Sequence, residues 1–438
     1  MINTLIRNEW LKKLLQYNNL YVGLSGGLDS TVLLHSLAKI PELFSKLKAI
    51  HIHHGLNENA SLWEEHCKQF CEQLSIPLIV RHVTIDNSAN IEERAREARF
   101  DAFSLELAQN DLIILAHHCD DQAETLLLNL FRGAGINGLA AMPKIKKFGL
   151  GAIARPFLDH SRKTLSDYAV KHKLLFVDDP SNQDPAFSRN YLRNNIMPLL
   201  QEKWPKVVSN LVRTTNLCQE AKANLYTLAE LDCSSLLGNT LNISSILSFE
   251  PQRISNILRA WLHNNEVRPP SFKVLSRIIN EVIYASVDAT PLVEWGNVAV
   301  RRYKMTLYLD KSNLSCSLKP RSWEKFPDPL QLDLNSNNSS FLHAKIADKG
   351  LQVAEGSNLE VRFREGGEIF YWRKQQKDLK KLFQQWSIPP WLRDSIPLLY
   401  INDELAAVVG YAISDHYLSS DPFNTYNVTL TRHPERCD

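Results

Sequence analysis

The amino-acid sequence predicts an α/β fold: an N-terminal doubly wound parallel sheet, followed by an α-rich domain and a small α+β C-terminal domain. The first 200 residues alternate short apolar runs with helical patterns, which is typical of a parallel sheet covered by helices. After Trp204-Pro205, long helical stretches replace this alternation, and short strand-like runs return at 293–309 and again beyond residue 350. These observations predict domains of different architecture.

The alternation locates each element of the first domain, which we expect over residues 1–205. Apolar runs predict strands at 20–24, 48–53, 77–85, 111–116 and 151–157. Helical spacing of apolar residues predicts helices at 30–40, 61–74, 91–109, 120–132 and 161–172. Ligands of such sheets bind at the carboxyl ends of the strands, so functional residues are expected there.

The remaining chain divides into three further stretches. An α-rich domain is expected at 206–310, with helices at 208–232, 251–264 and 272–286 and strands within 293–309. Residues 311–350 contain many Ser, Asn and Pro residues and predict a linker with partial order. A small C-terminal domain is expected at 351–438, with strands at 359–363, 406–409 and 426–430.

The composition is that of a folded protein without a large excess of charge. Among 438 residues, 44% are hydrophobic, and 50 Lys+Arg against 48 Asp+Glu give a formal net charge of +2. This balance excludes a globally basic, histone-like binder of nucleic acid. No run approaches the ~18 apolar residues of a membrane span, so we expect a cytoplasmic protein without a membrane partner.

The cysteines predict a reduced protein. Seven cysteines are scattered along the chain, and this odd, sparse set disfavours a disulfide framework. Cys67 and Cys71 lie four residues apart in a predicted helix, but the sequence contains no CxxC pair. We therefore expect both to be small core residues and not metal or redox groups.

The most informative segment runs from a strand into a glycine turn and a helix. Ser25, Gly26, Gly27, Leu28, Asp29 and Ser30 form this turn. Bare glycines let backbone N–H groups approach an anion, and the helix N-terminus adds partial positive charge, so the turn predicts a phosphate site. A carboxylate beside phosphates indicates a bound cation, which makes Asp29 a candidate Mg²⁺ ligand. The alternative is that Asp29 or Ser30 only caps the helix.

Three histidines stand at the end of the second predicted strand. Strand alternation puts His51 and His53 on one face, and His54 lies near the carboxyl edge. No carboxylate or thiol is close in sequence, which disfavours a metal site. Packed or hydrogen-bonded histidines and nucleotide contact by His53 or His54 both stay open.

Two arginines share one face of the helix predicted at 91–109. Arg96 and Arg99 are three residues apart and could neutralise phosphate oxygens of ATP or RNA. The alternative is a solvated face, because Glu92, Glu93 and Glu97 are spaced to pair with these arginines.

Two acids open the helix predicted at 120–132. Asp121 and Glu124 lie three residues apart on its first turn, where carboxylates are favoured, and together they could bind a cationic amine and take its proton. The alternative, simple capping of the helix, accounts less well for Glu124. The roles of His117 and His118 stay open.

A polar loop at 178–185 leads into a last helix of the first domain. Arg189 and Arg193 are four residues apart on that helix and could clamp a phosphate or a nucleobase edge. The alternative is that the loop is only solvent-exposed.

These motifs, in this order, resemble a known family. The Ser-Gly-Gly-Leu-Asp-Ser turn is followed by HHG at 53–55, ARxxR at 95–99, HHxxDQxET at 117–125 and DxSNxDxxxxRNxxR at 179–193. This series resembles the tRNA(Ile)-lysidine synthase family of the PP-loop ATP pyrophosphatase superfamily over about the first 200 residues, and the later layout is similar to that family's two extra domains. Phe100 stands where the family often has Tyr, and Cys119 where a larger apolar residue is expected.

The resemblance implies a reaction. ATP, with Mg²⁺, adenylates the C2 oxygen of the wobble cytidine in an isoleucine tRNA with a CAU anticodon. The ε-amine of free L-lysine then displaces AMP, and the product, lysidine, pairs with A instead of G.

The resemblance also implies roles for residues. Ser25, Gly26, Gly27, Leu28, Asp29 and Ser30 would hold the pyrophosphate of ATP, with Asp29 on Mg²⁺ and with His53, Arg96 and Arg99 as further ATP contacts. Asp121 and Glu124 would orient and deprotonate lysine. Arg189 would stabilise charge in the reaction, and Arg193 would contact the tRNA.

A basic, aromatic stretch supplies a candidate tRNA surface in a chain of charge +2. Residues 371–393 contain six basic groups against Asp378, with three tryptophans between them; we assign tRNA binding to Arg373, Lys374, Lys377, Lys380 and Lys381. The same stretch predicts an amphipathic helix with Leu379, Leu382 and Phe383 in the core, and both interpretations can hold.

Three rivals remain at the level of sequence. A tRNA thiolase of the same superfamily would need a reactive cysteine pair or a cluster site, which the absence of CxxC disfavours. A non-catalytic RNA-binding protein is disfavoured by the intact Asp29, Asp121 and Glu124. A glutamine-dependent amide ligase lacks its nucleophile signature. The oligomeric state stays open, with a homodimer as one option.

Overall fold

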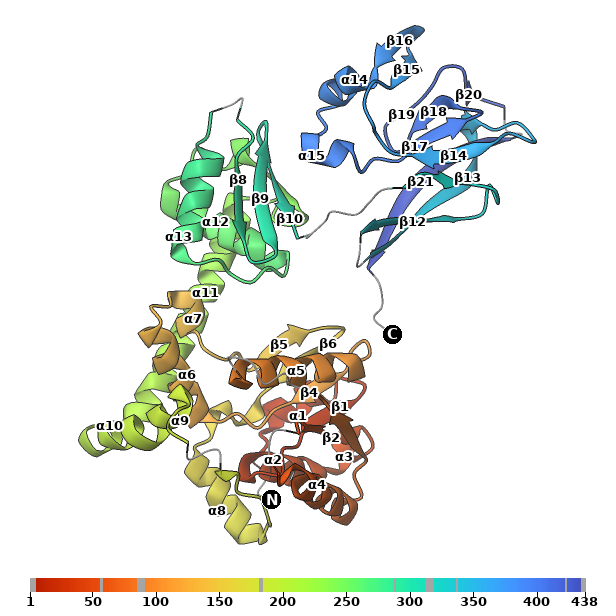
Figure 1. The fold of residues 1–438 in the computed structure, drawn as a ribbon. Coiled ribbons are helices and arrows are strands. Elements are labelled where there is room, and N and C mark those ends of the chain that lie inside the picture. The colour runs from red at the N-terminus through yellow and green to blue at the C-terminus, as the bar shows by residue number, and fades with distance from the viewer. Residues whose placement is uncertain are drawn as a thin grey trace. The chain divides into compact units, whose positions relative to one another are not determined.

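Figure 1 shows the computed structural model of the chain as a ribbon. It describes residues 5–55, 58–84, 91–180, 184–286, 289–311, 319–335, 338–421 and 424–434. Ser181, Asn182 and Gln183 of the polar loop, and Cys316 and Cys437, lie outside these residues. The chain forms two compact units, Met1–Leu228 and Ala229–Asp438.

The N-terminal unit is built on a six-stranded sheet. In the order β3-β2-β1-β4-β6-β5, its strands are β3 (Leu78–His82), β2 (Leu47–His53), β1 (Leu20–Gly23), β4 (Leu112–Ile114), β6 (Gly151–Ala154) and β5 (Ile145–Phe148). All neighbouring pairs are parallel except β5–β6, which is antiparallel. The predicted parallel sheet is therefore confirmed, with β5 as an additional edge strand.

Helices cover both faces of this sheet (Figure 1). They are α1 (Asn8–Leu14), α2 (Leu28–Ala38), α3 (Pro41–Phe44), α4 (Ala60–Leu74), α5 (Ile91–Glu106) and α8 (Arg162–His172); the unit also contains α6 (Cys119–Phe131) and α7 (Ile136–Leu139). Leu20 and Val22 pack in one core with residues of α2, α4 and α8, whereas Tyr21 and Ile113 pack in a second core with α5. Because successive side chains of a strand point to opposite faces, this division confirms the doubly wound arrangement.

The unit ends in a run of helices. They are α9 (Ser188–Tyr191), a π-helical turn at Leu192–Ile196, α10 (Met197–Lys203) and α11 (Val207–Asp232), whose last residues belong to the second unit. Leu192 and Met197 pack on Ala123 and Leu127 of α6. This contact fixes the last helices of the unit against α6.

The second unit begins with helices and an antiparallel sheet. The sheet order is β7-β10-β9-β8, formed by β7 (Thr240–Asn242), β10 (Thr306–Asp310), β9 (Val298–Tyr303) and β8 (Leu292–Trp295). The helices are α12 (Pro251–Asn264) and α13 (Phe272–Arg277), the latter continued by a π-helical turn at Ile278–Ile283. Trp261 of α12 is fully buried and anchors the local core.

The remainder of the second unit is rich in strands. One sheet has the order β11-β14-β17-β18-β19, another has the order β12-β13-β20 with β21 also on β13, and β15 pairs with β16. The strands are β11 (Arg321–Ser322), β12 (Leu330–Asn335), β13 (Asn338–Gln352), β14 (Leu359–Arg362), β15 (Ile369–Trp372), β16 (Gln375–Asp378), β17 (Leu398–Ile401), β18 (Glu404–Val408), β19 (Ala412–Ile413), β20 (Leu418–Ser419) and β21 (Thr425–Pro434). Strands β11 and β12 and most of β13 thus lie within the stretch 311–350, which was expected to be a partly ordered linker.

The basic stretch of the C-terminal domain differs from the predicted helix. Strands β15 and β16 form a hairpin, and Arg373 and Lys374 make its turn with φ of +57° and +59°. Two-residue hairpin turns favour positive φ because their twist matches that of the strands. The helix is confined to α14 (Leu379–Gln385), with α15 (Pro390–Arg393) following. Leu379, Leu382 and Phe383 are buried, as predicted.

Within the described part of the chain, no helix combines the length and the apolar character that a membrane span needs.

Candidate active site

The glycine turn connects β1 to α2 at the carboxyl edge of the sheet. Gly26 has φ of +84°, a conformation that side chains rarely adopt, and a Cβ there would lie 3.2 Å from Cys67 Sγ. Both restrictions require glycine at this position. The backbone can therefore follow the tight path that an anion-binding turn needs.

Serine hydroxyls brace the turn from inside. The backbone N–H of Ser25 donates to Ser30 Oγ at 3.2 Å, and Ser30 Oγ donates to the Gly27 carbonyl at 3.1 Å. Val177 N donates to the Gly26 carbonyl at 2.9 Å, which ties the start of the 178–185 loop to the turn. The polar loop and the glycine turn are thus neighbours in space.

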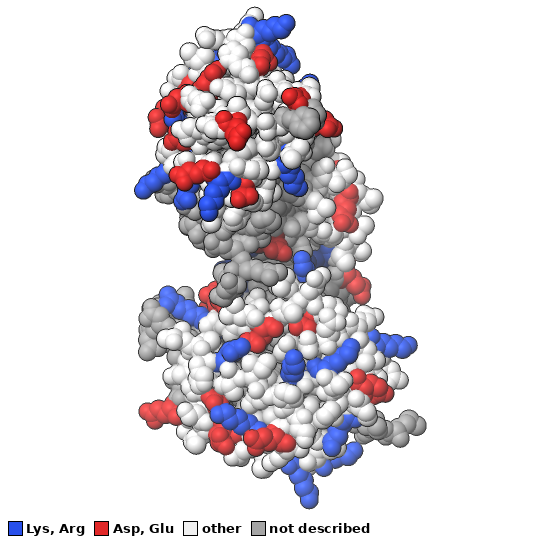
Figure 2. Space-filling model, turned by 90° about the vertical axis from the view of Figure 1, so that its right-hand side faces the viewer, with Lys and Arg blue, Asp and Glu red and all other residues white. Residues whose placement is uncertain are grey.

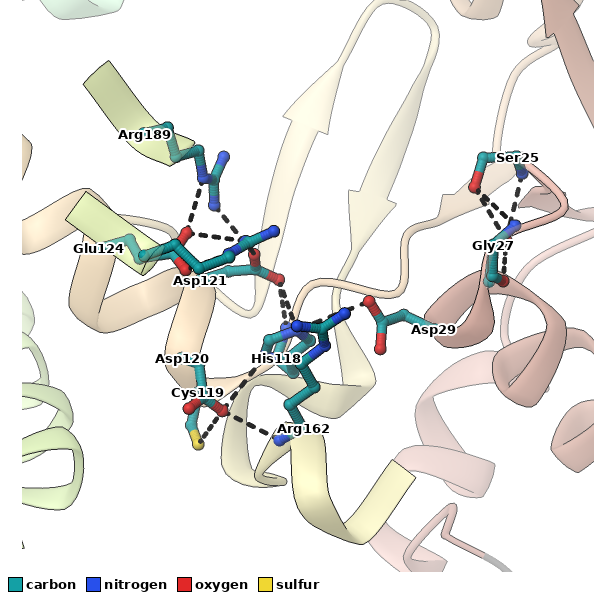
Figure 3. A network of polar contacts seen from close by, with 12 residues as sticks. Ser25, Gly27, Asp29, His118, Cys119, Asp120, Asp121, Glu124, Arg162 and Arg189 are labelled. Atoms are coloured by element: carbon teal, nitrogen blue, oxygen red, sulfur yellow. Dashed lines mark hydrogen bonds and ion pairs between the residues drawn. The ribbon is translucent and has the colours of Figure 1, made fainter. Parts of the chain in front are cut away.

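His118 joins the glycine turn to α6 (Figure 3). Its Nε2 lies 3.6 Å from Asp29 Oδ2 and 3.4 Å from Asp121 Oδ2, and its Nδ1 lies 3.4 Å from Asp120 Oδ2. The histidine is only 2% exposed. One imidazole therefore links three carboxylates, two of which belong to the predicted site.

The carboxylates keep this buried histidine charged. Burial would lower the pKa of His118, but contacts with Asp120, Asp29 and Asp121 outweigh it and raise the pKa to about 10. Burial would likewise raise the pKa of Asp121, but His118 and Arg189 hold it below its usual range. His118 is thus an imidazolium at neutral pH, and each of its ring nitrogens faces a carboxylate oxygen.

Asp121 and Glu124 form a second group of ion pairs with two arginines (Figure 3). Arg189 Nε lies 2.8 Å from Glu124 Oε2, and Arg193 Nε lies 2.6 Å from Glu124 Oε1. An Nη2 atom from each arginine lies 3.0 Å from Asp121 Oδ1. Glu124 is 2% exposed, so this is a nearly buried cluster of two acids and two bases.

Asp121 also caps its helix. Its Oδ2 accepts a hydrogen bond from the backbone N–H of His118 at 3.0 Å. The capping alternative from the sequence is therefore correct for one oxygen of Asp121, while the other oxygen receives the arginines. The carboxylate oxygens of Glu124 instead accept from Arg189 and Arg193.

A π-helical turn orients the two arginines. Arg189 lies in α9 and Arg193 in the π-helical turn that follows it, and Leu192 between them is buried. Such turns are common at functional sites. The arrangement brings Arg193, expected on the tRNA surface, into the same cluster as Arg189.

Positive charge gathers around α5. The guanidinium carbons of Arg96 and Arg99 lie 5.0 and 5.6 Å from the Phe100 ring centroid. Burial, with the charges of Arg96 and Arg189, lowers the pKa of Arg99 to about 10. Among the described residues, Arg99 Nε has no hydrogen-bond partner and is buried. A buried, unpaired N–H beside other cations suits an anionic ligand.

The predicted histidines occupy different environments. His51 is buried, and its Nδ1 lies 2.9 Å from the Leu24 carbonyl. Burial, with the charge of Arg99, lowers the pKa of His54 to about 4, and burial lowers that of His117 to about 3. The His53 ring lies 4.7 Å from the His82 ring, centroid to centroid, on the neighbouring strand.

Sequence reasoning missed His118 and Asp120 as members of the site. Both residues stand close to Asp121 in the sequence. However, Asp29, which contacts His118, lies 89 residues earlier in the chain, and no local spacing reveals that contact. The backbone N–H of Arg162 donates to Asp120 Oδ2 at 2.9 Å, a link to a third distant element.

Family models match three stretches of the chain. Residues 2–200 match a PP-loop domain, residues 241–308 a TilS substrate binding domain, and residues 359–428 a TilS substrate C-terminal domain. A U34-tRNA thiolase from Methanococcus maripaludis superposes with a TM-score of 0.41 at 20% identity, covering 47% of this chain and 74% of its own.

Curated relatives match over nearly the full length. A tRNA(Ile)-lysidine synthase of Legionella pneumophila (strain Lens) is 49% identical over 431 residues, covering 98% of this chain and 99% of its own. One of Coxiella burnetii is 38% identical over 417 residues, covering 93% and 92%. The sheet, the glycine turn and the family match define an ATP-using PP-loop enzyme. The chain belongs to the tRNA(Ile)-lysidine synthase family.

Proposed function

We propose that this enzyme forms lysidine at the wobble cytidine of an isoleucine tRNA with a CAU anticodon, using ATP and free L-lysine. The observation that carries the proposal is the connection of Asp29, Asp121 and Glu124, beside the glycine turn, through His118 and the two arginines. The curated relatives carry the name of this activity.

The first step is adenylation of the cytidine. The C2 oxygen attacks the α-phosphorus of ATP, the bond to the β-phosphate oxygen breaks, and pyrophosphate leaves. The turn from Ser25 to Ser30 holds the departing pyrophosphate with backbone N–H groups and hydroxyls. Arg96 and Arg99 can balance the negative charge of the phosphates. Cations that are already fixed in place stabilise the charge that develops on the leaving pyrophosphate, because the protein does not have to rearrange during the reaction.

Asp29 fits a divalent cation. Its Oδ2 faces His118, while its Oδ1 is buried and has no hydrogen-bond partner among the described residues. When bound there, Mg²⁺ would neutralise charge on the triphosphate. His118 holds the Asp29 carboxylate in position from the other side.

The second step is attack by lysine. The ε-amine adds to C2, AMP leaves with the C2 oxygen, and the nitrogen loses its extra proton. Asp121 and Glu124 bind the ammonium form and take a proton from it, because only the neutral amine is a nucleophile. Since both carboxylates are paired with Arg189 and Arg193, the incoming amine has to displace part of these contacts.

Asp29→Ala should reduce incorporation of labelled lysine into an isoleucine tRNA transcript by on the order of 10²–10³-fold. The substitution removes the candidate cation ligand and one partner of His118. The assay contains ATP, labelled lysine and the transcript, and counts label in the RNA. Asp167→Ala, an acid of α8, is the matched control and should retain activity. Wild-type protein without incorporation, or full activity of Asp29→Ala, would exclude the proposal.

We infer that the basic hairpin and α14 bind the tRNA body. Arg373, Lys374, Lys380 and Lys381 are exposed and Lys377 is half-buried, whereas Arg393 is buried and donates to the Ile388 carbonyl. Arg373 and Lys377 flank the Trp372 ring at 4.4 and 5.0 Å. Basic and acidic side chains are interspersed on the face shown in Figure 2, so local clusters have to supply phosphate contacts.

Changing Lys377, Lys380 and Lys381 together to Glu should weaken tRNA binding and reduce the slope of log affinity against log salt by about 1 for each lysine that binds a phosphate. ATP binding should not change. Filter binding over a salt series measures the effect. The triple change to Arg keeps the charges and is the control. Unaltered tRNA affinity of the Glu variant would refute the assignment.

Thiol chemistry has little support at this site. Burial raises the pKa values of Cys67, Cys71 and Cys119 to about 12, so these thiols are protonated at neutral pH. A sulfur-transfer enzyme needs a thiolate or a cluster ligand. These three cysteines are poor candidates for either.

A further inference from the structure

Three side chains of the kinds that bind metals lie where β2 and β3 end. One of them, His53, is the histidine that the family resemblance implies as an ATP contact; the other two have no role in the proposed reaction. His53 and His82 are direct partners in the parallel register of these strands. Direct partners point to the same face of a sheet, and the two rings lie 4.7 Å apart, centroid to centroid. His53 is half-buried and His82 is exposed, so the pair is accessible from solvent.

Helix α4 adds a carboxylate to this pair. Cys67, one turn beyond Glu64 on α4, has its Sγ 3.5 Å from His51 Nδ1, so this helix covers the face of β2 that carries the histidines. Glu64 Oε2 lies 3.5 Å from His82 Nε2. One donor atom from each of His53, Glu64 and His82 lies within 4.8 Å of the others.

We propose that His53, Glu64 and His82 form a binding site for a divalent transition-metal ion of the Zn²⁺ type. Two imidazoles and one carboxylate are ligands that Zn²⁺ prefers, and three protein ligands leave a fourth position for water. Bonds of about 2.0–2.1 Å to a tetrahedral metal put its donor atoms roughly 3.3 Å apart. The distance between Glu64 and His82 is close to that value, so small side-chain shifts suffice.

Neighbouring groups favour a metal site with Glu64, and not Cys67, as the third ligand. Lys68 Nζ contacts Glu64 at Oε1 and leaves Oε2 directed to His82. Hydrogen bonding to Lys68 and the nearby histidines lower the pKa of Glu64, so the carboxylate is ionised at neutral pH. Burial raises the pKa of the nearby Cys67 thiol to about 12, which makes it a poor ligand. The site is invisible to sequence patterns because Glu64 and His82 are 11 and 29 residues from His53.

Titration of the full-length, chelator-treated protein with Zn²⁺, without nucleotide, tests the site. Calorimetry should find one ion per chain, and Co²⁺ should give the visible spectrum of a four-coordinate N/O site. His82→Ala and Glu64→Gln should each weaken binding by at least ~10-fold, since even outer partners of metal ligands matter by that factor. Zn²⁺ should raise the midpoint of thermal unfolding in the wild type and not in these variants.

Two control variants separate ligation from general effects. His416→Gln, an exposed histidine paired with Glu404, should bind Zn²⁺ like the wild type. Lys68→Gln keeps a hydrogen-bond donor to Glu64 but removes a positive charge that repels the metal cation. This variant should therefore bind Zn²⁺ as tightly as the wild type or more tightly. Absence of binding in the wild type would overturn the proposal, as would unchanged affinity in folded His82→Ala and Glu64→Gln, or a loss in Lys68→Gln equal to that of Glu64→Gln.

Discussion

Glu124→Gln should reduce lysine incorporation by roughly 10²–10⁴-fold, the usual contribution of a positioned general base. Glu124 is the most deeply buried carboxylate of the cluster, and glutamine keeps its shape while removing its charge. The amine would then lose half of its counter-charge and one of its two proton acceptors. Adenylation, which involves no lysine, should continue.

Two assays separate these steps. Exchange of labelled pyrophosphate into ATP in the presence of tRNA reports adenylation and should persist in Glu124→Gln. Label from lysine in the tRNA reports the second step and should be absent. Equal loss in both assays would contradict the role assigned to Glu124, and so would normal lysine incorporation.

The substitution also has a structural cost that needs a control. Removing one partner of a buried ion pair costs roughly 3–5 kcal/mol, and we expect roughly 1–3 kcal/mol here because the Arg189 and Arg193 side chains are each 26% exposed. Glu106→Gln in α5 removes a half-buried carboxylate paired with Arg81 on the same domain. It should lower stability by less than Glu124→Gln and leave both reactions intact.

The site contains a group of carboxylates and a separate group of cations, although the net charge of the whole chain is only +2. Asp29, Asp121 and Glu124 each face a cation from another element, which fixes the positions of these carboxylates. The region around Arg99 gathers cations, and the buried Nε of Arg99 has no hydrogen-bond partner among the described residues. In the part of the chain that the structure describes, unpaired cationic N–H groups beside carboxylates held by arginines support the proposed reaction of a triphosphate with an amine. The phosphates can meet cations, and the amine can meet the carboxylates where it displaces part of the arginine contacts.

The sequence predicted the parts of the fold that local patterns determine. Strands β1, β2 and β4, and helices α2, α4 and α6, arise where predicted, because apolar runs and helical spacing reflect burial on the two faces of the sheet. Strand β5 was missed because Lys146 and Lys147 interrupt its apolar pattern, as is usual for an edge strand. The hairpin of β15 and β16 replaces part of the predicted helix, because its lysines and tryptophans have no clear period of two.

Contacts between distant residues were beyond the reach of sequence patterns. The glycine turn, Asp121, Glu124 and the arginine pair could each be named from local spacing. That Arg189 and Arg193 bind these two acids depends on the packing of Leu192 and Met197 against α6, which no spacing encodes. The bridging role of His118 depends in the same way on the closeness of two strand ends.

Raising the pH from 6.5 to about 10 should remove roughly 2–4 kcal/mol of unfolding free energy that His118 contributes. Its folded pKa of about 10 lies above the ordinary value of 6.5. The contribution is therefore complete below pH 6.5, declines as the pH rises, and is absent above about pH 10. Urea unfolding of wild type and His118→Gln over this range measures it as the difference between the two proteins.

His117 supplies the matched control, because its shift has the opposite sign. Burial lowers its pKa to about 3, so its contribution is present above pH 6.5 and is lost as the pH falls toward 3. His117→Gln should thus lose less unfolding free energy than the wild type as the pH falls from 6.5 toward 3. Between pH 6.5 and 10 its unfolding free energy should change with pH as that of the wild type does. Lysines and tyrosines that titrate near pH 10 are common to all three proteins and cancel in the differences. A constant difference between wild type and His118→Gln from pH 6.5 to 10 would show that His118 is not held as an imidazolium by Asp29, Asp120 and Asp121.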